Sequence, residues 1–342
     1  MGVLELILGA SLVGALTFYL LTGGADFGAG IWSFFTFGRH GQKQRALIDQ
    51  AIGPIWEANH VWLIVAVTIL FTAFPSAFSL ITTGLHIPLS LMLIGIVLRG
   101  TAFAVRTHDI TARFDGSSST PAVWRYMFAV SSVITPALLG ICLGAVASGR
   151  LTEVTSPGSF TDRFVAPWLA PFPLSVGVLT SALVTYLAAV YLLVEARDPH
   201  LHTLFTRRAV GSCSIVLLTS GTALWLARAG APEISARLEQ TTLGGGVIAA
   251  AILFHCAALA ALWKRHARAA RWCAIGGATV TLWGWALSQF PFLVEPHLTI
   301  AHASPEPTLR LLSVTLAVGS IVLFPLLYYL YRLFKGHVLP GG

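Results

Sequence analysis

Two acidic residues stand inside apolar segments, and they are the residues best suited to chemistry. Asp26 lies in LLTGGADFGAG (20–30), and Glu57 lies in PIWEANHVWLI (54–64). An ionisable group among apolar side chains is costly and is a functional candidate by default. His60 follows Glu57 by three residues, which predicts that both lie on one helix face, and imidazole titrates near neutrality. We therefore expect a proton pathway through Asp26, Glu57 and His60.

A counter-ion for these carboxylates is available in VLRGTAF (97–103), where Arg99 follows another apolar run. Burial raises a carboxyl pKa and a nearby cation lowers it, so such a group can be adjusted to exchange protons. The alternative is a structural polar cluster, in which Arg99, Asn59 and indole N–H groups simply satisfy the two carboxylates. The sequence alone leaves both interpretations open.

The glycines of the first segment support packing rather than phosphate binding. No strand precedes them and no P-loop lysine follows, so a nucleotide-binding loop is excluded. Gly24 and Gly28 have the small-xxx-small spacing that lets membrane helices approach closely. We expect this segment to pack tightly against a neighbouring helix.

The elements that position these residues are membrane helices. Of 342 residues, 56% are hydrophobic and only 10% are charged, whereas soluble domains carry about 25% charged residues. Apolar runs of membrane-spanning length recur along the chain. The first run has no basic region before it and predicts a retained helix, not a cleaved signal peptide. We predict an all-α polytopic membrane protein with nine transmembrane helices, at 3–36, 55–75, 77–104, 124–147, 171–194, 208–230, 244–263, 271–291 and 309–331.

The net charge of +7 reflects topology rather than nucleic-acid binding. Sixteen of the 21 basic residues lie in the connections after odd-numbered helices or at the C-terminus. By the positive-inside rule, the C-terminus is cytoplasmic and the N-terminus is outside. The other five lie on the opposite side: Arg150, Arg163, Arg228, Arg237 and Arg310.

Haem ligation by this chain is not expected. The histidines within predicted spans are His60, His86 and His255, which are scattered rather than paired. Haem iron needs axial His, Met, Cys or Tyr ligands in a suitable arrangement. The four cysteines lie in predicted spans without a CxxC motif, so we predict neither a metal site nor a disulfide.

An internal similarity suggests that the chain is built from two halves. Tyr19-Leu20-Leu21 precedes Asp26, and Tyr191-Leu192-Leu193 precedes Asp198, at an offset of 172 residues. This predicts a single integral membrane domain over 1–342 with a pseudo-repeat of about 1–170 and 171–291, followed by a final helix at 309–335. Coincidence among leucine-rich segments is the alternative.

Four segments together resemble one known family. TGGADFGAGIW (22–32), AIGPIWEANHVWLI (51–64), LRGTAF (98–103) and YLLVEARD (191–198) are similar to segments of subunit II of the cytochrome bd-type quinol oxidases. The resemblance covers the whole chain. It implies two four-helix bundles plus one peripheral helix, in the cell membrane of a bacterium or archaeon.

The resemblance also implies partners and cofactors. Subunit I would carry the b- and d-type haems, oxidise quinol and reduce oxygen to water with protons from the cytoplasm. Subunit II would bind no haem, stabilise subunit I and contribute part of the proton route around Asp26 and Glu57. Such complexes also contact the quinol pool and membrane lipid, which allows for a bound quinone or lipid, and they often include a small accessory subunit.

This sequence departs from the family pattern at two positions near the carboxylates. Ile55 replaces a histidine, and Gly23 replaces a second aspartate. Either the route runs through Asp26, Glu57 and His60, or subunit I carries more of it. A proton-coupled secondary transporter with a broken first helix is the main alternative function, although carboxylates near one membrane face disfavour it. A stand-alone membrane cytochrome is disfavoured by the histidine count.

Overall fold

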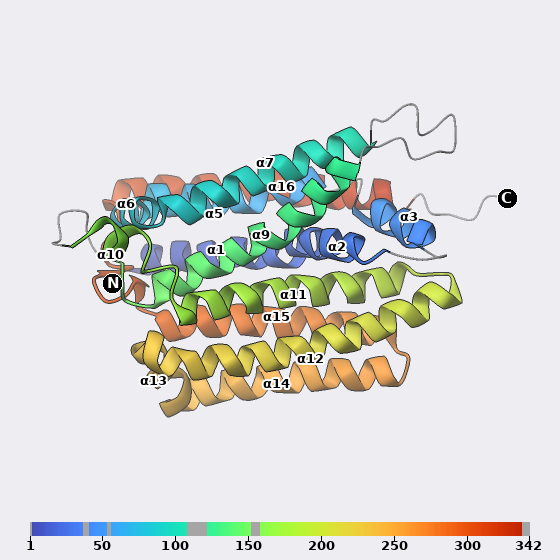
Figure 1. Ribbon diagram of the computed structural model, residues 1–342. Coiled ribbons are helices and arrows are strands. Elements are labelled where there is room, and N and C mark those ends of the chain that lie inside the picture. The colour runs from blue at the N-terminus through green and yellow to red at the C-terminus, as the bar shows by residue number, and fades with distance from the viewer. Residues whose placement is uncertain (1, 37–40, 53–55, 108–121, 152–157, 337–342) are drawn as a thin grey trace.

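The computed structural model describes residues 2–36, 41–52, 56–107, 122–151 and 158–336 (Figure 1). A few side chains at the borders of the gaps, including that of Glu57, lie outside the description. The elements are α1 (Val3–Phe18), the π-helix η1 (Tyr19–Gly23), α2 (Gly24–Phe34), α3 (Gly41–Ile52), α4 (Trp56–Asn59), α5 (Val61–Ala73), α6 (Pro75–Gly84), α7 (His86–Thr107), α9 (Ala122–Ala147), α10 (Phe160–Phe164), α11 (Pro171–Glu195), α12 (Pro199–Gly230), α13 (Pro232–Gln240), α14 (Thr242–Trp263), α15 (Ala267–Gln289), β1 (Phe292–Val294), β2 (Leu298–Thr299) and α16 (Glu306–Gly336).

Several helices begin where the local sequence dictates. Proline opens α6, α11, α12 and α13, because its fixed φ suits the first helical position and its missing N–H is not needed there. Asp198 caps α12 by accepting a 2.8 Å hydrogen bond from the backbone N–H of His200. Asp198 also accepts a hydrogen bond from Lys43 Nζ at 3.0 Å. The hydrogen bond from Lys43, and secondly the one from the His200 N–H, hold the pKa of Asp198 below its usual value.

The prediction of a polytopic helical membrane protein is confirmed. Among the described residues, seven helices are long and apolar enough to cross a membrane, or eight if the bent pair α5–α6 is one span. The predicted span at 271–291 forms α15 but is not among them. The count of nine, the orientation in the membrane and the pseudo-repeat stay predictions.

The predicted third span at 77–104 is wrong as a single helix, whereas a break close to its predicted start is present. The chain bends by 117° between α5 and α6, and a further break separates α6 from α7, so 77–104 is not one helix. Phe74 departs from helical geometry (φ −131°, ψ 59°) immediately before Pro75. This agrees with the rule that a residue preceding proline avoids the α conformation. The second break falls at Leu85, which also lies outside the α region.

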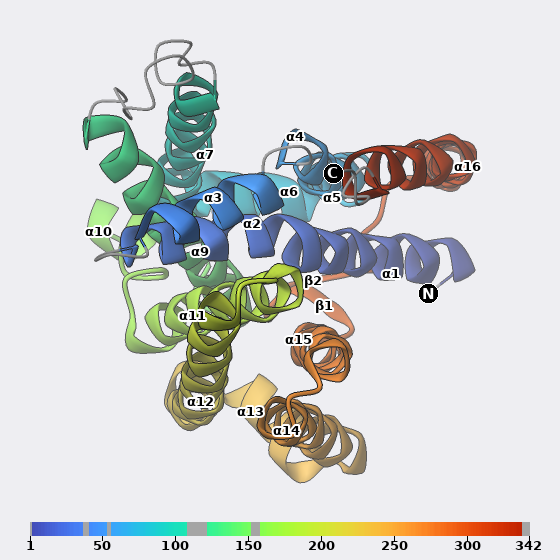
Figure 2. The same ribbon diagram turned by 90° about the vertical axis from the view of Figure 1, so that its right-hand side faces the viewer.

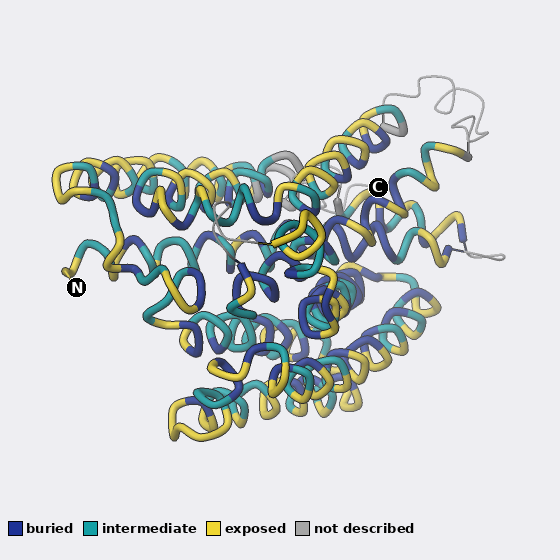
Figure 3. The backbone as a smooth tube through the Cα atoms, turned by 60° about the vertical axis from the view of Figure 1, so that its left-hand side comes forward, coloured by how far each residue is buried: buried dark blue, intermediate teal, exposed yellow. Residues whose placement is uncertain are grey.

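Helix α11 connects the two parts of the molecule. It packs against α12 and α15 on one side and against α2 and α9 on the other, and α14 packs against α15. In the end view, α11 lies between α2 and α12 (Figure 2). Helix α16 packs against α1 and α5. The side chains with the least exposure therefore concentrate along α11, whereas the outward faces of α12, α14 and α16 are exposed (Figure 3).

The two ends of the helix array differ in what they contain. Helix α3 and the α11–α12 and α14–α15 turns lie at one end, on the right in Figure 1. The start of α1, α6, α10 and α13 lie at the other. The end that holds α3 is therefore the one that the charge distribution predicts to be cytoplasmic.

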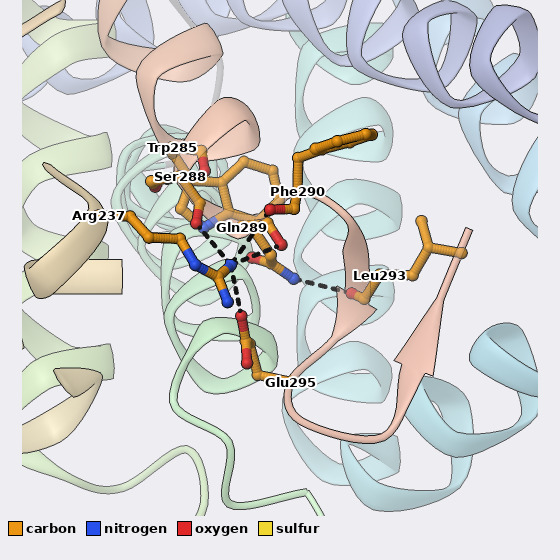
Figure 4. Close-up of polar contacts among 7 residues, drawn as sticks. All are labelled: Arg237, Trp285, Ser288, Gln289, Phe290, Leu293 and Glu295. Atoms are coloured by element: carbon orange, nitrogen blue, oxygen red, sulfur yellow. Dashed lines mark hydrogen bonds and ion pairs between the residues drawn. The ribbon is translucent and has the colours of Figure 1, made fainter. Parts of the chain in front are cut away.

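A hydrogen-bonded cluster anchors the β1–β2 hairpin at the opposite end (Figure 4). Arg237 Nη1 donates to the carbonyls of Ser288, Gln289 and Phe290 at the end of α15, and to Glu295 Oε1 at 3.0 Å. A cation is favourable at a helix C-terminus because it meets the unpaired carbonyls there. This arrangement ties α13, α15 and the hairpin together.

Candidate functional site around Asp26

The helix that carries Asp26 changes its winding just before the site. The N–H of Gly24 bonds to the carbonyl of Tyr19, which makes Tyr19–Gly23 a π-helical turn between α1 and α2. π-helical turns are rare in proteins, and those that do occur are frequently found at functional sites. Because the wider turn changes the register between α1 and α2, the faces of this span do not follow a single 3.6-residue period.

The glycines beside Asp26 allow backbones to approach closely, as predicted. A Cβ at Gly28 would lie 1.9 Å from the carbonyl oxygen of Val184 on α11. At Gly24 it would lie 3.0 Å from a methyl carbon of the same valine. At Gly30 it would lie 2.1 Å from Ser132 Oγ on α9. The glycines therefore seat α2 against α11 and α9, and that contact sets the position of Asp26.

Asp26 is half-buried and bonds to the segment that opens the second span. Its carboxylate accepts a hydrogen bond from Asn59 Nδ2, at the end of α4. The next residue is His60, whose ring centroid lies 5.9 Å from that of Tyr19 and 6.2 Å from that of Phe27. The first and second spans thus meet at Asp26, Asn59 and His60.

Arg99 completes this cluster from α7. Its side chain is only 2% exposed, and its guanidinium carbon lies 4.6 Å from the ring centroid of Phe27 and 5.1 Å from that of Phe128. Arg99 Nε donates to Ser132 Oγ at 3.3 Å. The charge of Asp26 acts on Arg99, and the Arg99 charge acts on His60. A buried arginine needs a compensating negative charge, and Asp26 supplies one.

The structure brings together three of the four predicted site residues. Arg99 and His60 lie against the ring of Phe27, and Asp26 bonds to Asn59, the residue before His60. The expectation that Glu57 and His60 share one helix face stays a prediction, because the side chain of Glu57 lies outside the described residues. Helix α4 ends at Asn59, and His60 lies in a turn before α5, with a ψ of −16° that departs from regular α-helix.

Two residues of the cluster were not predicted from the sequence. Tyr19 is buried beside Gly23, and Ser132 supports Arg99 while donating to the carbonyl of Phe128 at 2.6 Å. The signal for each was a hydroxyl in an apolar run, which is too common to select a residue. The indole of Trp32 donates to the carbonyl of Thr185 rather than to a carboxylate.

A cavity of about 490 Å³ adjoins Tyr19 and lies among α1, α9, α11, α12, α14 and α15. Its lining is mostly apolar but includes His255 and Trp285. His255 Nδ1 bonds to the carbonyl of Ala251 at 2.7 Å, and its ring packs against Gly277. His255 Nε2 and Trp285 Nε1 are buried without a hydrogen-bond partner in the described part of the chain. An apolar lining with a few polar atoms is typical of a small-molecule site.

Comparison with known proteins identifies the family of this chain. The sequence model of the family "Cytochrome bd terminal oxidase subunit II" matches residues 4–334. The chain belongs to this family.

Relatives of the subunit II family are similar over different lengths. "Putative cytochrome bd menaquinol oxidase subunit II" of Bacillus subtilis is 23% identical over 94% of this chain and 92% of that protein. "Cytochrome bd ubiquinol oxidase subunit 2" of the same organism is 31% identical, but over 34% of this chain and 32% of that protein. "Cytochrome bd-I ubiquinol oxidase subunit 2" of Escherichia coli is 27% identical over 62% of this chain and 53% of that protein.

A solved structure is similar over almost the whole chain. The bd oxidase from Geobacillus thermodenitrificans contains a chain that is 26% identical, with a TM-score of 0.78, covering 97% of this chain and 99% of that chain. The fold of this protein is therefore that of a subunit of a terminal oxidase. Within the described residues, no group of three His, Cys, Asp or Glu side chains could hold a metal ion.

Proposed function

We propose that this chain is the haem-free subunit of a bd-type quinol oxidase and that it conducts protons toward its partner. The haem-bearing subunit I would oxidise quinol and reduce oxygen to water, and a small accessory subunit would complete some assemblies. Family membership supports this function over a proton-coupled transporter. The complex would lie in a bacterial or archaeal cell membrane.

The observation that carries the proton role is the contact of Asp26 with Asn59 beside the buried Arg99. A carboxylate within a membrane protein is tolerated when an opposite charge and hydrogen-bond donors compensate it. Arg99 provides the charge and Asn59 the donor, so Asp26 can release and take up a proton at its carboxylate oxygen. His60 lies next to Asn59, and imidazole can pass a proton between its two nitrogens.

The proposed direction is inward from the cytoplasm. Asp26 lies in α2, and α2 leads toward α3, which lies at the end of the molecule where the basic turns gather (Figure 1). That end is predicted to be cytoplasmic from the distribution of arginine and lysine. Glu57 belongs to the same route in this proposal, since it lies in α4 two residues before Asn59. Ile55 and Gly23 supply no titratable group, so Asp26 is the central residue of the route.

The cavity beside Tyr19 is the proposed location of a bound quinone or lipid. His255 Nε2 and Trp285 Nε1 would hold its polar head, because both residues line the cavity and both atoms are buried without a partner in the described part of the chain. The Nδ1–H bond to Ala251 would leave Nε2 as an acceptor, while the indole N–H is a donor. A ligand with a hydroxyl and a carbonyl would satisfy both atoms, and the apolar lining would take its tail.

The decisive experiment replaces the carboxylates without changing their shape. Asp26→Asn and Glu57→Gln would be introduced into the complete oxidase, and oxygen consumption with quinol would be measured together with haem content. Because a positioned proton-transfer group contributes at least about 100-fold to a rate, and other routes compensate in part, we expect turnover to fall about tenfold or more. Haem content should be unchanged.

A matched control separates this effect from a general loss of acidic charge. Asp162→Asn makes the same change in α10, at the opposite end, where the carboxylate accepts a hydrogen bond from the Ser159 hydroxyl. Its turnover should equal that of the wild type. If Asp26→Asn and Glu57→Gln also turn over normally, the two carboxylates belong to a structural cluster and the proton proposal fails.

A further inference from the structure

The turn between α14 and α15 carries a concentrated positive charge. Two exposed tryptophans flank it: Trp263, 91% exposed at the end of α14, and Trp272, 70% exposed in α15. We name this the basic turn surface, and its cations are Lys264, Arg265, Arg268 and Arg271, with His266 between them in the sequence.

These cations have no acidic partner in the described part of the chain. No aspartate or glutamate occurs between 242 and 289, and Arg271 only lies over the ring of Tyr191, at 4.9 Å. Two cations elsewhere at this end have polar partners. Lys43 bonds to Asp198, and Arg208 donates to the carbonyl of Phe35 and to Gln44. The basic turn surface therefore presents uncompensated charge to its surroundings.

The backbone of the turn holds an arginine where glycine would be favoured. Arg265 has φ +60°, the left-handed conformation, and it is the only described non-glycine residue with a positive φ. The bonds from the N–H of His266 to Ala261 and of Arg265 to Leu262 define a Schellman motif. Its left-handed position is usually glycine, because a Cβ is disfavoured there. Arg268 adds a second cost, since the dipole at the start of α15 disfavours a cation.

A positive-inside bias explains why cations lie at this end, but it does not explain an arginine at the left-handed position. A binding partner with negative charge would compensate both costs. Helix α14 is apolar and long enough to cross a membrane, and it ends at Trp263, so the turn lies where lipid headgroups begin. Exposed tryptophan side chains are typical of that interfacial layer.

We propose that the basic turn surface binds the headgroups of anionic phospholipids. Lysine and arginine beside a membrane attract anionic lipid, and the effect grows with each added cation. An acidic segment of a protein partner would also match the charge, but the two exposed tryptophans at the borders fit a lipid interface. This inference does not depend on the proposed proton route, because it concerns only α14, α15 and their turn.

The test uses quenching of tryptophan fluorescence by brominated lipid. The full chain, in the complex with which it purifies, would be placed in phosphatidylcholine vesicles containing an equal small fraction of brominated phosphatidylglycerol or brominated phosphatidylcholine. The difference between the wild type and W263F/W272F isolates the signal from this surface. We expect a local enrichment of the anionic lipid of about tenfold, decreasing as salt is added.

Two variants with altered charge make the test specific. K264Q/R265G/R268Q should reduce the enrichment to about twofold or less. R125Q/R207Q neutralises two exposed arginines in α9 and α12, and it should retain the enrichment. R265G alone should raise the melting temperature in neutral detergent while weakening the lipid preference, which separates binding from folding.

Three results would overturn the proposal. The first is equal quenching of the wild type by the two lipids. The second is an unchanged preference in the triple variant. The third is no quenching of Trp263 and Trp272 by either lipid, which would mean that protein covers this surface.

Discussion

The substitution Gly28→Ala tests whether the approach of α2 to α11 positions Asp26. The added Cβ would lie 1.9 Å from Val184 O, 2.5 Å from Val184 C and 2.7 Å from Ala188 Cβ. Real Cβ atoms essentially never come closer than 3.0 Å. Two of these atoms belong to the backbone and cannot move by a change of rotamer. Helix α2 must therefore withdraw by about 1 Å.

The magnitude follows from two opposing effects. Overpacking a dense core costs about 1–3 kcal/mol, and we expect the upper end because α11 is held between α2, α9, α12 and α15. Replacing glycine by alanine within a helix returns about 0.5–1 kcal/mol. The net destabilisation should be about 2 kcal/mol.

Gly14 offers a matched control on the same span. A Cβ there meets nothing within 4 Å, so Gly14→Ala should show only the helix-propensity gain of about 1 kcal/mol. The two variants should differ by about 3 kcal/mol, which is roughly 6 °C in melting temperature for a protein of this size. Thermal unfolding of the purified complex, followed by fluorescence, measures this difference.

Turnover provides the second measurement on the same proteins. If α2 withdraws, Asp26 moves away from Asn59, and oxygen consumption should fall in Gly28→Ala even well below its melting temperature. Equal stability of the two alanine variants would refute the packing argument. A destabilised Gly28→Ala protein with normal turnover would refute the link between this contact and the site.

Two further predictions concern the hairpin and the cavity. Burial raises the pKa of Glu295 above its ordinary value of 4.5, although Arg237 opposes the rise. The contribution of Glu295 to stability is therefore complete below pH 4.5, and it is lost as the pH rises through the raised pKa of the folded state. The melting temperature should therefore fall more steeply as the pH rises above 4.5 in the wild type than in Glu295→Gln, and equal slopes would contradict this. For the cavity, mass spectrometry of organic extracts should find a quinone or lipid retained with the purified wild type and lost in Gly221→Leu, whose new side chain enters the cavity. Gly211→Leu, also in α12 but away from the cavity, should retain the molecule, and a wild type without it would refute the assignment.

Much of the architecture could be predicted because a membrane imposes simple rules on sequence. Apolar runs give the helices, since backbone groups in lipid must bond within the segment. The runs at 124–147, 171–194 and 244–263 correspond closely to α9, α11 and α14. The break between α6 and α7 was not predicted, although TTGLHIP (82–88) contains a glycine and a proline on either side of Leu85, which is a pattern typical of a helix end.

The candidate site could be predicted only in part. Asp26 stands out because a carboxylate among apolar residues is rare, and Arg99 stands out for the same reason. Their proximity depends on the packing of α2 against α9 and α11, which involves residues more than 100 positions apart in the chain, such as Gly28 and Val184. Helical periodicity also fails across the π-turn Tyr19–Gly23, so the faces of the first span could not be assigned.

The sequence by itself determined the class of protein, the approximate helices and the rare charged residues within them, because each follows from local composition and the cost of charge in lipid. Only the tertiary structure decided which of those residues meet. It paired Asp26 with Asn59, buried Arg99 between two aromatic rings, and left four Lys and Arg side chains at the α14–α15 turn without an acidic partner among the described residues. The reason is physical: a side chain's partners across a helix interface depend on how closely and at what rotation two helices pack, and that depends on contacts distant in sequence.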